Sequence, residues 1–94
     1  MNSLGTTPLH IAAIRGDVRA IRALLLAGAE IDARGEHGYT PLHEAVEQGH
    51  YEAARCLLDQ GSSLIIANDD GLTAAELAAV IGETRITELF KRAE

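Results

Sequence analysis

The sequence predicts an all-α domain built as a solenoid of short helix–turn–helix repeats. The first observation is composition: hydrophobic residues make up 47% of the 94 residues but aromatic residues only 3%. A core of Ala, Leu, Ile and Val suits closely packed short helices better than a β-sandwich. The second is an internal repeat of 33 residues, and the third is a recurring set of helix start and stop signals.

The repeat is visible in the glycines and in one longer phrase. TTPLHIAAIRG, from Thr6, returns as YTPLHEAVEQG, from Tyr39. A fixed period of this length is typical of proteins in which each unit buries its apolar face against the next unit. Two sets of three glycines keep the interval of 33: Gly5, Gly38 and Gly71, and Gly16, Gly49 and Gly82.

The first helix of each unit is predicted to follow a threonine. Thr7 can cap the helix with its hydroxyl, and Pro8 then occupies the first helical position, where its missing N–H costs nothing. Gly16 stops the helix after about two turns, too short to be stable alone in water. The equivalent residues are Thr40, Pro41 and Gly49 in the second unit, and Thr73 and Gly82 in the third.

A second helix and an extended finger complete each unit. Residues 17–27 and 50–60 carry apolar residues at helical spacing, and Gly28 and Gly61 follow them. The polar, turn-rich stretches that come next predict fingers with tight turns.

The pattern G-x-T-P-L-H-x-A-x-x-x-G, followed by paired leucines and a glycine, resembles the ankyrin repeat. The resemblance implies a single domain, residues 1–94, with repeats at about 2–34, 35–67 and 68–94. Each repeat would be a β-turn finger with two antiparallel helices, and the repeats would form a curved stack.

The two ends of this stack differ. The third unit lacks Pro-Leu-His, and it places Thr87 and Lys91 where the earlier units have apolar residues, so we expect a C-terminal cap. The first unit has no polar cap before it. Either its apolar atoms are tolerated, or a partner or second copy covers them, or the chain belongs to a longer array.

No residue pattern favours catalysis, a metal or a cofactor. The resemblance implies that His10 and His43 bond to the threonine and to the turn backbone, tying one finger to the next. No histidine pair has metal-ligand spacing, and NDDG, from Asn68, lacks the later acidic ligands of a calcium loop. A hydrolase using His43 with Glu44 or Glu47 is the enzymatic alternative.

Ser62 and Ser63 have no positioned base, and no glycine-rich loop cradles a phosphate. We therefore expect a non-enzymatic protein. Cys56, the only cysteine, lies in the apolar pattern of the second unit and is predicted to be an inert buried thiol.

Charge and hydropathy argue against nucleic acid and a membrane as partners. The net charge of −6 opposes nucleic acid binding. The N-terminus lacks the basic segment followed by an apolar run that a signal peptide has, and no stretch approaches the ~18 apolar residues of a membrane span. We expect a cytoplasmic protein.

The charge is unevenly distributed along the chain. Residues 1–34 carry four arginines and three acidic residues, residues 35–67 carry one arginine and five acidic residues, and residues 68–94 carry three basic and six acidic residues.

What remains is a surface for a protein or peptide. The resemblance implies docking on the concave side, formed by finger tips and by the ends of the first helices. Tyr39 is the expected anchor, and Val80 and Ile81 could instead pack into the cap. The predicted partner-binding residues are Ile14, Arg15, Glu36, His37, Tyr39, Glu47, Gln48, Asp69, Asp70, Leu72, Val80 and Ile81, with Leu4 and Thr6 beside them.

Ile65 and Ile66 occupy finger positions that are polar or small in the first unit. If exposed they would indicate a contact site, and if buried they would pack under the third finger; we expect packing. The predicted function is a protein-binding module, monomeric or weakly dimeric, whose partner has a basic or amphipathic contact region. The alternatives are self-association through the uncapped first repeat and an inhibitor or immunity-type protein.

Overall fold

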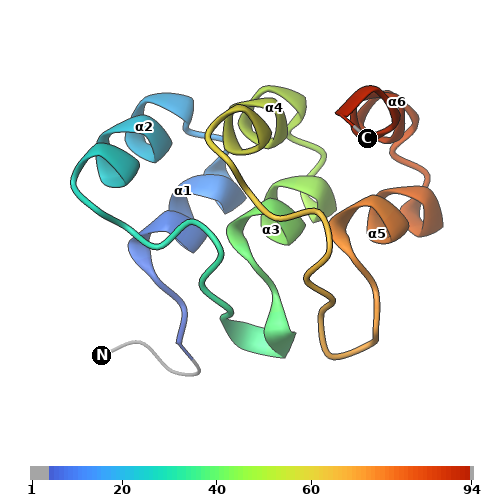
Figure 1. Ribbon diagram of the computed structural model, residues 1–94, viewed down its shortest axis with the longest axis horizontal. Helices are drawn as coiled ribbons and strands as arrows, with labels where there is room; N and C mark the ends of the chain where they lie inside the picture. The colour runs from blue at the N-terminus through green and yellow to red at the C-terminus, as the bar shows by residue number, and fades with distance from the viewer. Residues whose placement is uncertain (1–4, 94) are drawn as a thin grey trace.

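The computed structural model describes residues 5–93, which form three helix pairs placed side by side (Figure 1). Within this range there is no strand, so the predicted all-α class is confirmed. The molecule measures 33 × 26 × 20 Å. The elements are α1 (Pro8–Arg15), α2 (Val18–Leu26), the 3-10 turn η1 (Glu36–Gly38), α3 (Pro41–Glu47), α4 (Tyr51–Asp59), α5 (Ala74–Ile81) and α6 (Thr84–Ala93).

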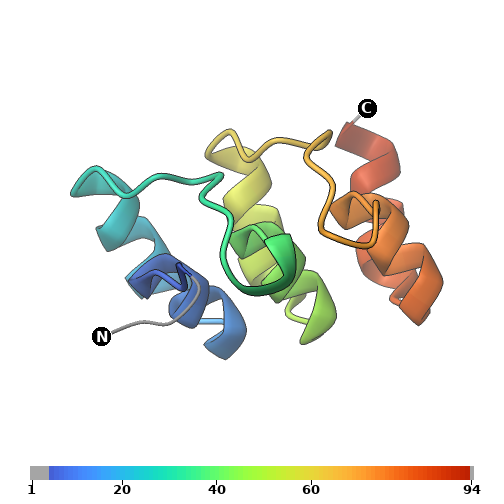
Figure 2. The same ribbon diagram turned by 90° about the horizontal axis from the view of Figure 1, so that it is seen from below.

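The helices form two rows. In Figure 1, α1, α3 and α5 make the lower row and α2, α4 and α6 the upper one, and each helix contacts its neighbour in the same row and its partner in the same pair. The two finger loops, residues 27–40 and 60–73, run past the lower row, as the view from below also shows (Figure 2). Each pair therefore buries its apolar side against the next pair, as expected of a repeat stack.

The helix signals act as the sequence predicts. The Thr7 hydroxyl accepts the His10 backbone N–H at 3.2 Å, and Thr40 and Thr73 cap α3 and α5 in the same way. Gly16 ends α1 in the left-handed conformation, with φ at 69°. Because a glycine meets no Cβ clash there, the chain can turn at once into α2.

Two buried histidines link the helix pairs through the fingers. In His43, Nδ1 accepts the Thr40 backbone N–H at 3.1 Å, and Nε2 lies 2.9 Å from the carbonyl oxygen of Leu72 in the next finger. A carbonyl can only accept, so Nε2 carries the proton and the ring is neutral. His10 makes the same pair of contacts with Thr7 and Tyr39. The structural role that the resemblance implies for both histidines is confirmed.

The core is aliphatic and continuous through the three pairs. Its largest fully buried members include Leu9, Ile21, Leu42 and Leu57, and Phe90 closes it in α6. Cys56 is a buried free thiol, as predicted.

The last pair has the features of a cap. Glu76 stands where the earlier units have histidine, and its carboxylate accepts the Thr73 backbone N–H at 2.9 Å without reaching a further finger. Lys91 is exposed, and Thr87 is half-buried at the position where Ile21 and Ala54 are fully buried. A charged and polar outer side removes the need for another repeat.

The prediction that Ile65 packs under the third finger is wrong, because 86% of Ile65 is exposed. Its neighbour Ile66 is half-buried. Consecutive side chains of an extended segment point to opposite sides, so only one of the two can face the stack.

Candidate functional site

The twelve residues predicted to bind a partner come from two places in the fold. Ten of them are exposed, whereas Tyr39 and Leu72 are half-buried, as is Thr6. Leu4 lies outside the described residues. We call these twelve residues the inner face: Glu36, His37, Tyr39, Asp69, Asp70 and Leu72 from the fingers, and Ile14, Arg15, Glu47, Gln48, Val80 and Ile81 from the ends of α1, α3 and α5 or just after them.

Tyr39 joins the two parts of the inner face. Its hydroxyl donates to Oε2 of Glu47 at 3.2 Å, which connects the first finger to the end of α3. The centre of its ring lies 5.4 Å from that of His43 and 6.4 Å from that of His37. Burial, together with the negative charge of Glu47, raises the pKa of Tyr39 to about 12. The phenol therefore stays neutral and keeps its proton for the bond to Glu47.

A group of carboxylates surrounds this tyrosine. Burial and the nearby charges of Glu47 and Glu36 raise the pKa of Glu44 to about 7. Asp70 adds to the field that acts on Tyr39. Among the described residues, none of these carboxylates is in an ion pair with Lys, Arg or His. The surface around Tyr39 thus carries negative charge that its own neighbours do not neutralise.

Glu44 is not among the twelve predicted partner-binding residues, although it is named in the enzymatic alternative with His43. It is half-buried on α3 and close to Glu36, Glu47 and His37. The signal is in the repeat: the position of Glu44 holds Ile11 in the first unit and Leu77 in the third, so an acid stands where the neighbouring units have an apolar residue.

Asp69 has a different neighbour from the other acids. It forms an exposed ion pair with Arg34 at 3.5 Å, and Arg34 also donates to the carbonyl of Ala67 at 3.1 Å. The backbone N–H of Asp69 donates to the carbonyl of His37 at 3.0 Å. These bonds hold the two fingers together, so the Asp69 side chain is already engaged in the finger structure.

The apolar members of the inner face divide into exposed and packed residues. Val80 is 69% exposed, and Ile14 and Ile81 are also exposed, so the alternative that Val80 and Ile81 pack into the cap is wrong. Leu72 is partly buried against the core. Arg15 and Gln48 are exposed beside Ile14 and Glu47 and make no side-chain hydrogen bond or ion pair within the described residues.

The family described as ankyrin repeats (3 copies) matches residues 1–67. The chain belongs to the ankyrin-repeat family. The match ends where the third unit begins to depart from the pattern of the first two. A comparison with curated proteins gave no match.

Ankyrin repeats are generally protein–protein interaction modules and are typically not enzymes. In residues 5–93 of this ankyrin-repeat protein, no three side chains of His, Cys, Asp or Glu are placed to hold a metal ion together. No helix in the same range is long and apolar enough to cross a membrane.

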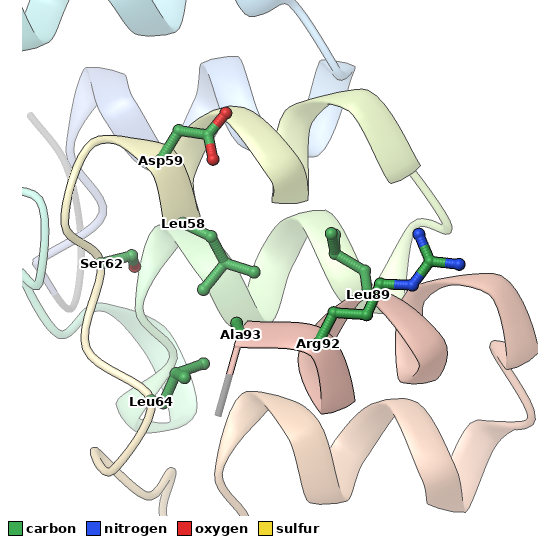
Figure 3. Close-up of a pocket in the computed structure, with 7 residues that line it drawn as sticks. All are labelled: Leu58, Asp59, Ser62, Leu64, Leu89, Arg92 and Ala93. Carbon is green, nitrogen blue, oxygen red and sulfur yellow. The ribbon is translucent and has the colours of Figure 1, made fainter.

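The ankyrin stack also has a hollow of about 290 Å³ away from the inner face (Figure 3). Leucines and Ala93 form much of its wall, and the Ser62 hydroxyl is buried there without a hydrogen-bond partner among the described residues. No histidine lines it, so Ser62 has no imidazole base beside it. The lining residues are Leu58, Asp59, Ser62, Leu64, Leu89, Arg92 and Ala93.

Proposed function

We propose that this ankyrin-repeat protein is a non-enzymatic binding module whose inner face holds a protein or peptide segment of basic, amphipathic character. The observation that carries the proposal is the position of Tyr39. It is a half-buried aromatic ring whose hydroxyl is fixed by Glu47, and unpaired carboxylates surround it. Tyrosine is favoured at binding hot spots because it buries a large rigid area and keeps a polar tip.

The charge of the partner follows from the carboxylates. Glu44 is half-buried close to two other acids, and burial together with the negative charges of Glu47 and Glu36 raises its pKa. A lysine or arginine from a partner would remove that repulsion, and charge-assisted hydrogen bonds are stronger than neutral ones. An acidic partner would increase the repulsion.

The apolar part of the partner follows from the ends of α1 and α5. Ile14, Val80 and Ile81 are exposed at equivalent or adjacent repeat positions, so they present apolar area beside the acidic finger tips. A segment that combines basic and apolar residues would satisfy both parts of the surface.

A non-enzymatic role is supported by the histidines that would be the first candidates for catalysis. Both ring nitrogens of His10 and of His43 are used in hydrogen bonds to the backbone, which leaves neither imidazole free to exchange a proton with a substrate. A free buried Cys56 fits a reducing compartment, and we propose the cytoplasm.

The first experiment uses two synthetic helical peptides with the same apolar pattern, one with lysines and the other with glutamates at the polar positions. Fluorescence anisotropy should show that the basic peptide binds and that its affinity falls as salt is added. Tyr39→Ala should weaken binding about tenfold or more, whereas the matched control Tyr51→Ala, which changes the other tyrosine, should not.

A capture experiment then identifies the natural partner. Wild-type protein and an Ile14→Ala, Tyr39→Ala variant are exposed to the host lysate after circular dichroism shows equal helicity. A partner retained only by the wild type supports the inner face. Tight, salt-sensitive binding of the acidic peptide would contradict the proposed charge of the partner, and equal binding by Tyr39→Ala would contradict the site.

A further inference from the structure

The side chain of Arg34 joins the two fingers. Its Nε donates to the carbonyl of Gly38 in the same finger at 3.4 Å, and its Nη2 donates to the carbonyl of Ala67 in the next finger at 3.1 Å. The same Nη2 lies 3.5 Å from Oδ1 of Asp69. One guanidinium therefore contacts both of the fingers that run past the lower row of helices (Figures 1 and 2).

Gly38 provides the space for this contact. It is buried, and an added Cβ would lie 2.5 Å from Oδ1 of Asp69, 2.7 Å from Nη2 of Arg34 and 2.9 Å from the backbone nitrogen of Asp69. That nitrogen donates to the carbonyl of His37 at 3.0 Å, so it cannot move aside without moving the second finger. The missing side chain lets the fingers approach. We call Arg34, Gly38 and Asp69 the finger clamp.

The repeat shows that the clamp belongs to one pair of fingers. The position of Arg34 holds Ala67 in the second unit, which has no side chain to reach another finger. Gly71 is the equivalent of Gly38 and has a similar left-handed backbone, with φ at 80° against 72°, but an added Cβ there meets no atom within 4 Å. Gly71 is therefore required only by the turn, whereas Gly38 is also required by the clamp.

The clamp holds the finger half of the inner face. Apart from the short turn η1, neither finger contains a helix or a strand, so few backbone hydrogen bonds fix its path. A loop that a partner has to order on binding loses conformational entropy, and this lowers the affinity. The inner-face residues carried by the two fingers are Glu36, His37, Tyr39, Asp69, Asp70 and Leu72.

Charge alone predicts the opposite effect for Arg34. Its removal would make an acidic surface more negative and would release Asp69 to pair with a basic partner, so binding governed only by charge would become tighter. The ion pair itself contributes little to global stability, because the Arg34 and Asp69 side chains are 52% and 66% exposed. An effect of Arg34 that weakens binding must therefore come from the placement of the fingers.

We propose that Arg34 is a positioning residue: the finger clamp fixes the two fingers relative to each other and so preorganises the inner face for its partner. The proposal rests on the proposed function of the inner face. A surface that is already ordered loses less entropy when the partner binds, and the gain appears as affinity. Arg34 itself carries the same sign of charge as the expected partner and need not contact it.

Arg34→Gln tests the proposal with the basic helical peptide. We expect its affinity to fall about fivefold or more, although the variant has lost a positive charge. Hydrogen exchange read residue by residue should show the Asp69 amide exchanging about tenfold faster, with the core helices unchanged. The matched control is Arg55→Gln, which removes an exposed arginine on α4 that makes no side-chain hydrogen bond or ion pair within residues 5–93. It should bind the peptide as well as the wild type or slightly better.

Gly38→Ala tests the clamp from its other side, and Gly71→Ala is the matched control. Both substitutions place a side chain on a left-handed backbone, but only Gly38→Ala pushes the second finger away from the first. Gly38→Ala should therefore weaken peptide binding by several-fold more than Gly71→Ala. Where Gly38→Ala is too unstable to measure, the comparison of Arg34→Gln with Arg55→Gln decides.

Peptide binding by Arg34→Gln that equals or exceeds that of the wild type would overturn the proposal. Losses of the same size in Arg34→Gln and Arg55→Gln would overturn it as well. If the wild type bound neither the basic nor the acidic peptide, the proposed function would fail, and hydrogen exchange would then decide on the clamp alone. Faster exchange of the Asp69 amide in Arg34→Gln would support the clamp, and an unchanged rate would overturn it.

Discussion

The imidazole of His43 donates from Nε2 to the carbonyl oxygen of Leu72, 29 residues further along the chain, at 2.9 Å. The same ring accepts the Thr40 backbone N–H through Nδ1, at 3.1 Å. A single buried side chain therefore joins the start of α3 to the next finger. This bond connects the second helix pair to the third, and it fixes the finger that carries Asp70 and Leu72 of the inner face.

Replacing this side chain should destabilise the protein. His43→Ala leaves the Thr40 N–H and the Leu72 carbonyl without their partner in a buried place, and we expect the free energy of unfolding to fall by about 2–3 kcal/mol. Urea unfolding followed by circular dichroism measures it. The control is His37→Asn: His37 is exposed at a finger tip with φ at 59°, which asparagine tolerates, so its change should stay within about 0.5 kcal/mol. Equal losses in the two variants would contradict the linking role of His43.

The same histidine should make stability depend on pH. Burial lowers the pKa of His43 from 6.5, so the unfolded chain binds a proton more readily than the folded one. The contribution of His43 is therefore present above pH 6.5 and is lost as the pH falls through the lowered pKa. The difference in unfolding free energy between wild type and His43→Ala should shrink between pH 7.5 and pH 5. A constant difference over this range would contradict a neutral, buried ring.

Most of the fold could be predicted because the residues that start and end the helices recur in successive repeats. Thr7, Pro8 and His10 return 33 residues later as Thr40, Pro41 and His43, and a repeated local signal leaves little choice of secondary structure. The polar outer side of α6 was equally visible, since Lys91 replaces the leucines of the earlier units. Helix type, helix ends and the cap all follow from such local comparisons.

The parts that the sequence did not reveal depend on side-chain direction and on proximity between elements. Ile65 and Ile66 are adjacent and chemically identical, and only the path of the finger decides that Ile65 points outward. Glu44 belongs to the acidic surroundings of Tyr39 because the first finger brings Glu36 and His37 close to α3. That proximity is tertiary, and no local pattern around Glu44 encodes it.

Gly16 should be intolerant of a side chain for two separable reasons. Its φ of 69° strains any L-residue, and an added Cβ would lie 2.7 Å from Cγ of His50. His50 donates to the carbonyl of Ile14 at 2.9 Å, so moving its ring breaks a bond between the first two helix pairs. Gly16→Ala should cost about 2–4 kcal/mol in the free energy of unfolding.

Gly82→Ala is the matched control for Gly16→Ala. Gly82 ends α5 at the equivalent repeat position with φ at 81°, but an added Cβ there meets no atom within 4 Å. The control variant should lose only the cost of the left-handed backbone, about 1–2 kcal/mol. Urea midpoints of the two variants measured together isolate the contribution of the His50 contact, and equal midpoints would show that this contact adds nothing.

Glu44 should lower stability at high pH, and its removal should reveal this. Burial and the charges of Glu47 and Glu36 raise the pKa of Glu44 from 4.5 to about 7, so the folded state holds the proton more tightly than the unfolded chain. The associated stability is complete below pH 4.5 and is lost as the pH rises through about 7. Glu44→Gln keeps the shape and removes the charge. Because Glu44 is only half-buried, we expect a gain of about 1 kcal/mol at pH 8 and little change at pH 4.5.

The control for Glu44→Gln is Glu52→Gln, which removes an exposed carboxylate on α4 and should change stability by less than about 0.5 kcal/mol at both pH values. Urea unfolding at pH 8 and pH 4.5 gives the free energies of unfolding of the two variants at both pH values.

The same Glu44→Gln variant should bind the basic peptide more weakly at pH 8, since it loses one of the carboxylates around Tyr39. A charge that destabilises the folded protein but strengthens binding is typical of functional sites, where stability is lost in exchange for function. Equal gains at both pH values, or unchanged peptide affinity, would show that Glu44 has no such role.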